Sequence, residues 1–281
     1  MPDFVTRFAP SPTGLLHLGH AASAFHVWEA ARQAGGRMLL RIEDIDLGRC
    51  KPEYTDAIFE DLAWLGFEWE ELVRIQSEHF GEYEKVVETL TAMGLTYRCF
   101  RTRSEIAEEQ AQAGLAPGMP FTGQPLPPEE EAERLGAEAP FTWRLSLEKC
   151  RAWLGPRYDQ LAFELLSPGG HTETVKARPD LHGDINLTRK DSPTAYHVAA
   201  THDDALQGIT HVIRGEDLAE AAHIHVLLQA LMDWPQPVYT HHPLVMGPDG
   251  KRLAKRFQSK SLASLRADGL SPDQVRRLAG V

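Results

Sequence analysis

The chain has 281 residues, of which 42% are hydrophobic, which predicts one large domain or two linked domains with a substantial core. The net charge of −11 argues against a nucleic-acid partner, but basic residues gather after residue 250, so charge alone does not decide this question. No apolar run reaches membrane-spanning length, and no signal-peptide pattern is present. Cys50, Cys99 and Cys150 fit neither a disulfide framework nor a zinc pattern, and they favour a reducing cytoplasm.

The first predicted element is a strand that leads through a turn into a helix. Alternation over residues 4–8 predicts the strand, and the prolines and glycine of 9–14 predict the turn. A helical period runs from Leu18 to a stop at Gly35. The N-terminus of a helix binds phosphate through its unpaired N–H groups and its positive dipole end, so we expect a nucleotide at this turn.

Two glycines and two histidines at the turn suit chemistry on a phosphate. Gly14 and Gly19 have no Cβ, which lets a nucleotide approach the backbone closely. His17 and His20 lie three residues apart, so we expect them on one helix face. There they can donate hydrogen bonds to phosphate oxygens as charge grows in a transition state. A surface helix with two solvated histidines is the alternative interpretation.

The next elements repeat the strand–helix order. An apolar run over 37–44 predicts a buried strand with Glu43 near its carboxyl end, and helices are predicted over 52–65 and 79–93. This order indicates a βαβ unit, in which ligands collect at the carboxyl ends of the strands. We therefore expect residues 7–11 and Glu43 at the same edge of a sheet.

The character of the sequence changes in the middle of the chain. Residues 98–112 look helical, and prolines then interrupt the chain between 117 and 140. Strands are predicted over 141–145 and 158–166. We interpret 98–185 as an insertion in the nucleotide-binding domain.

The pattern of the first part then returns. Strands are predicted over 194–200 and 210–214, and a helix is predicted over 218–232. We interpret His223 and His225 on this helix as ordinary helix residues and not as ligands. No internal repeat offers a competing organisation.

A glycine-rich turn and four cations mark residues 247–256. Loops that close over phosphates use glycine hinges and point charges, so this segment could bring ammonium charge to a triphosphate. A solvated basic loop is the alternative interpretation.

The two ends of the chain together resemble the class I aminoacyl-tRNA synthetases. His17-Leu-Gly-His20 and Arg252-Leu-Ala-Lys255-Arg256 are similar to the two signature motifs of that class, although Ala254 stands where serine is common. Residues 7–14, 41–44 and 212–217 closely resemble glutamyl-tRNA synthetases. The resemblance covers most of the chain and is weakest over about 100–190.

The resemblance implies an α/β fold with a Rossmann-type catalytic domain. Its halves would be 1–97 and 186–247, around an inserted α+β acceptor-type subdomain over 98–185. Residues 248–281 would form the loop of the second signature motif and a short helical tail. We expect no anticodon-binding domain, because little chain follows Arg256.

A short chain of this kind resembles the glutamyl-Q tRNA(Asp) synthetases, and Ala200 supports this because full-length glutamyl-tRNA synthetases have asparagine there. That family activates L-glutamate with ATP and attaches the glutamyl group to queuosine in the anticodon loop of tRNA(Asp). The resemblance implies this ligase activity here, with ATP and Mg²⁺, and we expect a cytoplasmic monomer that does not bind membranes.

The resemblance also implies the site residues, and their chemistry agrees with it. Arginines can bind the carboxylates of glutamate, and an acidic residue can hold its ammonium. The expected catalytic residues are His17, His20 and Lys255. The expected glutamate-binding residues are Arg7, Ala9, Ser11, Glu43, Tyr196 and Arg214. The expected ATP-binding residues are Gly14, His17, Gly19, His20, Arg252 and Lys255.

The usual zinc site of the resembled family is degenerate. That site uses a Cys-x-Cys pair, a tyrosine and a later cysteine, whereas here only Cys99 remains, with Arg101 and Pro125 near the other positions. A single thiol cannot build a tetrahedral site, so we expect no zinc and interpret Cys99 as a buried apolar residue.

Three alternatives stay open from the sequence. The chain could be a glutamyl-tRNA synthetase core that charges a tRNA 3′ end. It could be a non-catalytic synthetase paralogue that binds tRNA, although its intact motifs speak against decay. It could also be a small-molecule nucleotidyltransferase of the same fold, which the segments 41–44 and 212–217 disfavour, because fold alone does not fix function.

Overall fold

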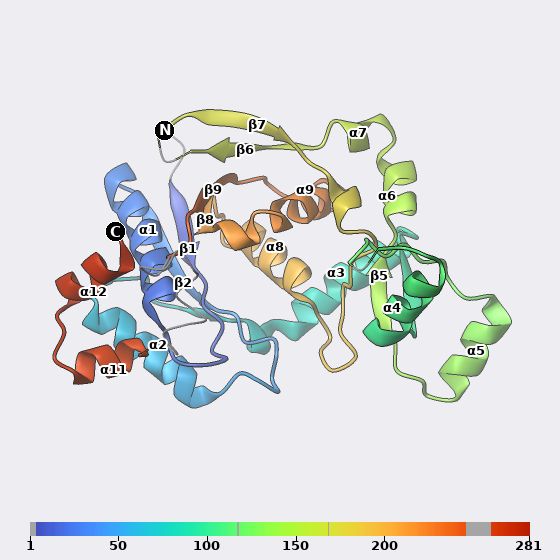
Figure 1. Ribbon diagram of the computed structural model, residues 1–281. Coiled ribbons are helices and arrows are strands. Elements are labelled where there is room, and N and C mark those ends of the chain that lie inside the picture. Colours follow the sequence, from blue (N-terminus) through green and yellow to red (C-terminus); the bar gives the residue numbers. More distant parts are fainter. Residues whose placement is uncertain (1–3, 117, 168, 246–259) are drawn as a thin grey trace.

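A parallel sheet with helical connections forms the first part of the molecule. In the computed structural model, which describes residues 4–116, 118–167, 169–245 and 260–281, β2 pairs in parallel with β1 on one side and β3 on the other (Figure 1). The elements are β1 (Val5–Phe8), α1 (Leu18–Ala34), β2 (Arg37–Ile42), α2 (Pro52–Trp64), β3 (Arg74–Ile75), the 3-10 helix η1 (Gln76–His79) and α3 (Phe80–Ala92). The predicted strand–helix–strand–helix order is confirmed.

Local sequence sets the limits of α1. The imidazole of His17 caps its N-terminus, and the helix ends where Gly35 takes φ 61°, a left-handed conformation that favours glycine. Buried side chains such as Phe25 pack in one core with Leu40 of β2. The predicted start at Leu18 and the predicted end are therefore confirmed.

A second sheet lies beside the first. Its strand order is β7-β6-β9-β8, and only β7 is antiparallel to its neighbour. The backbone N–H of Thr210 donates to the Val5 carbonyl at 2.9 Å, which places β8 alongside β1. The elements are β6 (Ala162–Leu166), β7 (Thr172–Lys176), η2 (Pro179–Leu181), α8 (Tyr196–Leu206), β8 (His211–Gly215), η3 (Glu216–Leu218), α9 (Ala221–Met232) and β9 (Val238–His242).

The middle of the chain adds a small α+β unit. Its elements are β4 (Thr96–Cys99), α4 (Arg103–Gln112), α5 (Pro128–Gly136), β5 (Thr142–Leu145), α6 (Leu147–Leu154) and α7 (Pro156–Asp159), and β4 pairs antiparallel with β5. The buried Asp184 carboxylate joins its parts, since it accepts hydrogen bonds from the Tyr97 hydroxyl at 2.8 Å and from the backbone N–H groups of Gly123 and Leu147, each at 2.9 Å. The limits 98 and 185 of the insertion stay a prediction.

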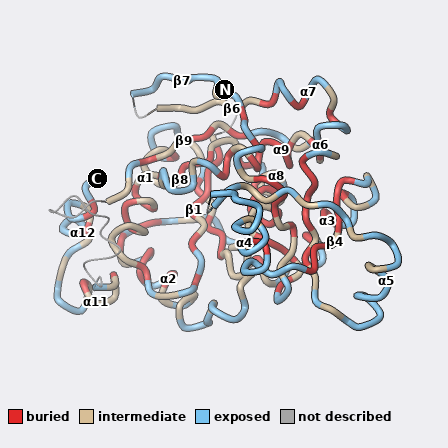
Figure 2. The backbone as a smooth tube through the Cα atoms, turned by 45° about the vertical axis from the view of Figure 1, so that its right-hand side comes forward, coloured by how far each residue is buried: buried red, intermediate tan, exposed pale blue. Residues whose placement is uncertain are grey.

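The last helices return to the start of the chain. α11 (Leu262–Ala267) lies on α2 and α12 (Pro272–Ala279) lies on α1, as Figure 1 shows in red against blue. Leu262 and Val275 join the buried core of the first sheet. Figure 2 shows the buried residues of the chain in red, mostly in the interior of the molecule. The Leu262 N–H also donates to the Leu16 carbonyl at 2.8 Å, directly before the cap of α1. No helix in the described ranges is long and apolar enough to cross a membrane.

Three predicted elements need correction. The prediction of a strand over 194–200 is wrong, because α8 begins at Tyr196; its alanines favour a helix, and Asp203 and Asp204 continue it because they turn inward to buried partners. The helix predicted over 98–112 begins only at α4, since the residues before it pair as β4. The strand predicted over 158–166 begins at β6, after the short helix α7.

Candidate active site

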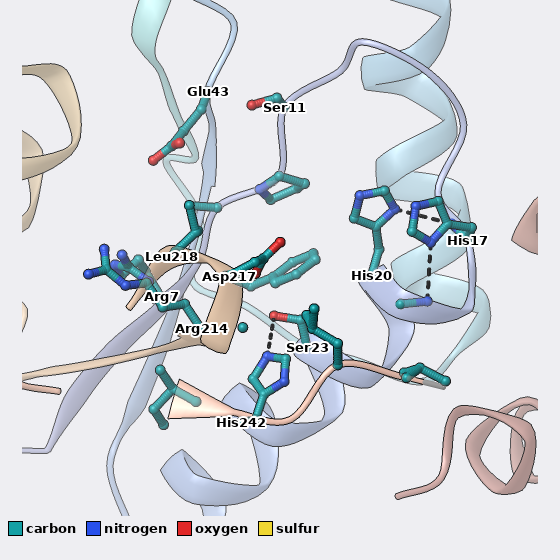
Figure 3. Close-up of a pocket in the computed structure, with 18 of the residues that line it drawn as sticks. Arg7, Ser11, His17, His20, Ser23, Glu43, Arg214, Asp217, Leu218 and His242 are labelled. Carbon is teal, nitrogen blue, oxygen red and sulfur yellow. Dashed lines mark hydrogen bonds between the residues drawn. The ribbon is translucent and has the colours of Figure 1, made fainter. Parts of the chain in front are cut away.

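A pocket of about 570 Å³ opens at the carboxyl ends of β1, β2 and β8 (Figure 3). Most of the expected site residues line it: Arg7, Ala9, Ser11, His17, Gly19, His20, Glu43, Tyr196 and Arg214. Gly14 does not line the pocket. A Cβ at this position would meet no atom within 4 Å. The expected Arg252 and Lys255, with the loop around them, lie outside the described residues.

Two kinds of side chain mark the two ends of the pocket. Figure 3 shows the Arg7 and Arg214 side chains at one end and the His17 and His20 rings at the other. The first end comes from two neighbouring strands, and the second comes from the turn into α1. The pocket can therefore hold an anionic group and a phosphate chain at the same time.

The two histidines form a reciprocal cap at the start of α1. The Gly19 N–H donates to His17 Nδ1 at 3.1 Å, and the His17 N–H donates to His20 Nδ1 at 3.2 Å. Because a backbone N–H can only donate, each Nδ1 is unprotonated and each ring carries its proton on Nε2. The rings stack with 3.9 Å between their centroids. His17 is thus the N-cap and does not lie on a helix face, which corrects the prediction that the two histidines share one face.

Both imidazoles are neutral at physiological pH. Burial lowers the pKa of His17, and burial together with the neighbouring His17 lowers the pKa of His20 to about 3. They can therefore act as neutral Nε2–H donors. Glycine at position 19 also has a local structural reason, since a Cβ there would lie 3.1 Å from His17 Cε1. The glycine thus makes room for the imidazole, which the sequence pattern did not indicate.

A buried ion network lies at the other end. Arg7 donates from Nε and Nη2 to the two oxygens of Asp204 at 2.8 and 3.4 Å, and Arg41 donates from Nη1 to Asp204 Oδ1 at 2.9 Å. Arg41 Nη2 also donates to Glu43 Oε1 at 3.0 Å. Burial raises the pKa of Glu43 although Arg41 and Arg7 oppose this shift. Burial also tends to raise the pKa of Asp204. Here Arg7 and Arg41 outweigh burial, so the pKa of Asp204 is lowered.

Arg214 differs from these arginines. The residue is 4% exposed, and its Nε and Nη2 have no hydrogen-bond partner among the described residues. Nη1 lies 3.5 Å from His225 Nδ1, and the guanidinium carbon lies 5.3 Å from the centre of the Tyr239 ring. Asp204 and Glu43 pair with Arg7 and Arg41, whereas no carboxylate among the described residues forms an ion pair with Arg214.

Several lining and supporting residues were missed from the sequence. Arg41 and Asp204 carry the ion network, and His225, which we interpreted as an ordinary helix residue, contacts Arg214. Other lining residues without a predicted role are Ser23, Asp217, Leu218 and His242. A charged residue inside an apolar strand, as Arg41 is, was a usable signal, because a fully buried arginine needs an acidic partner.

The surroundings of Cys99 do not offer a metal-ligand set. Cys99 is 5% exposed and packs with Tyr97, Ile106 and Phe121, while Arg101 pairs with Glu109 at 3.2 Å. Within the described parts of the chain, no group of three His, Cys, Asp or Glu residues is placed to hold a metal ion. One thiol next to a cation does not fit a tetrahedral zinc site, so the expectation of no zinc stays a prediction that agrees with this donor set.

Known proteins resemble the chain over nearly its whole length. The family model described as tRNA synthetases class I (E and Q), catalytic domain, matches residues 3–278. A Glutamyl-Q tRNA(Asp) synthetase of Rhodobacter capsulatus is 42% identical and covers 99% of this chain and 100% of its own. One of Symbiobacterium thermophilum is 38% identical, with 96% and 83% covered.

A solved structure shows the same fold. The glutamate tRNA ligase from Elizabethkingia meningosepticum, in complex with its amino acid, superposes with a TM-score of 0.74 and is 30% identical. The match covers 92% of this chain, which spans 53% of the length of that ligase. The similarity therefore includes both the sheet that carries the pocket and the inserted unit.

Proposed function

Since the chain belongs to the class I tRNA synthetases of the glutamate and glutamine type, a family of ligases, we propose that it activates L-glutamate with ATP and transfers the glutamyl group to queuosine in the anticodon loop of tRNA(Asp). The fold is the class I catalytic domain, a Rossmann-type α/β domain with an inserted α+β unit and a short helical tail. The resemblance noted in the sequence motifs is confirmed by these relatives.

The charge of the pocket supports glutamate as the substrate. Free glutamate carries two carboxylates and one ammonium, and one of the carboxylates could pair with Arg214, which has no acidic partner among the described residues. The Nε–Nη2 edge of Arg214 carries the proposal, because this edge can donate two parallel hydrogen bonds to the side-chain carboxylate. Arg7 and the Tyr196 hydroxyl would add to this contact, Glu43 would hold the ammonium, and Ser11 would contact the substrate from the turn.

The opposite end of the pocket suits the triphosphate of ATP. In the activation step, a glutamate carboxylate oxygen would attack the α-phosphorus while the bond to the β-phosphate breaks and pyrophosphate leaves. The Nε2–H groups of His17 and His20 would donate to the phosphate oxygens as negative charge grows on them. ATP would carry Mg²⁺ on its phosphates, and Lys255 would follow the leaving pyrophosphate. Such catalysis depends mostly on positioning and electrostatics.

Transfer completes the reaction. A hydroxyl of the queuosine ring would attack the glutamyl carbonyl of the adenylate, which forms an ester and releases AMP and a proton. The full-length similarity to two synthetases named for tRNA(Asp) supports this acceptor over a tRNA 3′ end. We also propose that the chain works as a monomer. Its free cysteines favour the reducing cytoplasm as its compartment.

Two assays test the proposal in sequence. Glutamate-dependent ATP–pyrophosphate exchange without tRNA tests the activation step. If no exchange occurs, the proposal that this chain activates glutamate before it binds tRNA is wrong. Labelled glutamate is then offered with tRNA(Asp) that carries or lacks queuosine, and with tRNA(Glu). Label confined to queuosine-containing tRNA(Asp) supports the proposal, whereas label on the 3′ end of tRNA(Glu) would identify a glutamyl-tRNA synthetase core instead.

A further inference from the structure

We propose that His225 is a positioning residue: it binds one edge of the Arg214 guanidinium and so keeps the opposite edge turned toward the side-chain carboxylate of the substrate. This inference rests on the proposed function, because it assigns a specificity role to a residue behind the glutamate pocket. His225 does not line the pocket itself.

The use of edges by other arginines in this chain supports the assignment. Arg7 binds Asp204 through Nε and Nη2, and Arg37 binds Glu70 through the same pair of atoms at 2.5 and 2.6 Å. In Arg214 this pair is buried and has no partner among the described residues, while Nη1 faces His225. His225 thus leaves free the edge through which Arg7 and Arg37 each bind both oxygens of one carboxylate.

The chemistry of an imidazole suits this task. A guanidinium has only donors, so His225 Nδ1 accepts from Arg214 Nη1 and the ring proton lies on Nε2. The distance of 3.5 Å is at the long limit for such a bond, and substrate binding is expected to shorten it. Burial and the nearby Arg214 hold the pKa of His225 well below its usual value, so the ring stays neutral. A neutral acceptor orients the cation without compensating its charge.

An acidic residue at the same place would act differently. Asp204 shows the effect, because its carboxylate occupies the Nε–Nη2 edge of Arg7. A carboxylate at the position of His225 would likewise pair with a guanidinium, here that of Arg214. It would then compete with the substrate carboxylate for the positive charge. His225 therefore helps the pocket to favour a carboxylate over an uncharged amide.

The surroundings hold the His225 ring in place. The residue is 1% exposed, and its ring centroid lies 5.6 Å from that of Tyr196 and 5.4 Å from that of His197. Tyr196 lines the pocket, so His225 packs against one expected glutamate contact and hydrogen-bonds another. One side chain on α9 thereby supports both of them.

Two substitutions, one with and one without a hydrogen-bond acceptor, separate positioning from packing. The amide oxygen of His225→Asn can replace Nδ1 as an acceptor, whereas His225→Leu has a similar volume and no acceptor. Glutamate and ATP kinetics are measured for both variants in ATP–pyrophosphate exchange, together with thermal melting. His223→Leu, two residues earlier on α9, controls for a general disturbance of the helix, because His223 contacts Arg178 and Phe163 and not Arg214.

We expect His225→Leu to raise KM for glutamate about tenfold and to lower the preference for glutamate over glutamine by a similar factor. Its kcat and its KM for ATP should stay within about twofold of the wild type, and His225→Asn should recover most of the loss. Leucine favours a helix more than asparagine does, so a purely structural role would rank the two variants in the opposite order. If His225→Leu does not fold, His225→Phe, which keeps a ring, replaces it.

The outcomes separate this inference from the proposed function. No glutamate-dependent exchange by the wild type, or an unchanged KM for glutamate in Arg214→Ala, would overturn the proposed function itself. If both of these behave as proposed but His225→Leu matches the wild type, or His225→Asn is impaired equally, the positioning role alone is wrong.

Discussion

The guanidinium of Arg41 lies 2.9 Å from the carboxylate of Asp204, although 163 residues separate the two in the sequence. Both side chains are almost fully buried, so the pair joins the end of β2 to α8. Because Asp204 also binds Arg7, one carboxylate fixes two arginines at the glutamate end of the pocket.

Replacement of this shared carboxylate should therefore be severe. We expect Asp204→Asn to lower the free energy of unfolding by about 3–5 kcal/mol, because it leaves two buried guanidinium groups with Glu43 as their remaining acidic partner. Chemical denaturation measures the loss. Glu70→Gln, which breaks the exposed pair with Arg37, should lose less than about 1 kcal/mol. Equal losses in the two variants would contradict the role of Asp204.

Removal of the Arg214 side chain should change substrate choice. We expect Arg214→Ala to lower kcat/KM for glutamate about 100-fold and to leave the low activity with glutamine nearly unchanged, because only glutamate offers the carboxylate. Amino-acid-dependent pyrophosphate exchange gives both values. Arg103→Ala, at an exposed position, is the control. Unaltered discrimination in Arg214→Ala would remove this residue from the amino-acid site.

The histidine pair should act on the chemical step. We expect His20→Ala to slow adenylate formation about 100-fold or more, while the affinity for glutamate changes little, because the lost donor acts on phosphate charge that develops in the transition state. Rapid-quench kinetics and equilibrium titration separate the two quantities. His171→Ala, at an exposed turn, should alter neither. Parallel losses of rate and affinity would instead indicate a structural role.

The pH dependence of the same step follows from the tautomers. The pKa of His20 is lowered to about 3, so this ring stays neutral as the pH falls from 8 to 6, and burial lowers the pKa of His17 as well. We therefore expect the rate of adenylate formation to show no loss in this window from protonation of His20. If the rate falls with a midpoint near 6.5 and this fall disappears in His20→Asn, the assigned neutral state is wrong.

A buried carboxyl outside the pocket should make stability depend on pH. Asp61 on α2 is fully buried, neither oxygen has a hydrogen-bond partner in the described structure, and Arg266 lies 3.6 Å away. Burial raises its pKa to about 6, so the protonated form favours folding below pH 4 and this contribution is lost as the pH rises through 6.

The variant Asp61→Asn tests this dependence. Relative to it, the wild type should lose on the order of 1–3 kcal/mol of unfolding free energy between pH 4 and pH 7. Urea denaturation at both pH values measures the difference. Asp56→Asn, at an exposed position of the same helix, should show no such dependence.

The sequence predicted the elements whose signals are local. The turn, the helix from Leu18 to Gly35 and the strand that presents Glu43 could be placed because caps, glycines and periodicity lie within the elements themselves. α8 could not, because the partners that bury Asp203 and Asp204 stand more than a hundred residues earlier in the chain. A local pattern shows those acids only as polar residues.

The same distinction holds for the site. Motifs brought Arg7, His17, His20 and Arg214 to one pocket, and the structure places all of them there. Their supports were not predictable, because the task of His225 depends on which edge of a guanidinium it meets. That relation exists only after β8 and α9 have packed together.

The Arg214 edge that has no partner in the described part of the chain also affects the folding of the substrate-free protein. A buried donor without an acceptor destabilises the native state, so the pocket illustrates a trade-off between stability and function. A substrate that binds only the folded chain offsets this loss of stability. Glutamate should therefore raise the melting temperature as its concentration exceeds its dissociation constant. The amino acid would then serve as a structural counterion before it serves as a reactant.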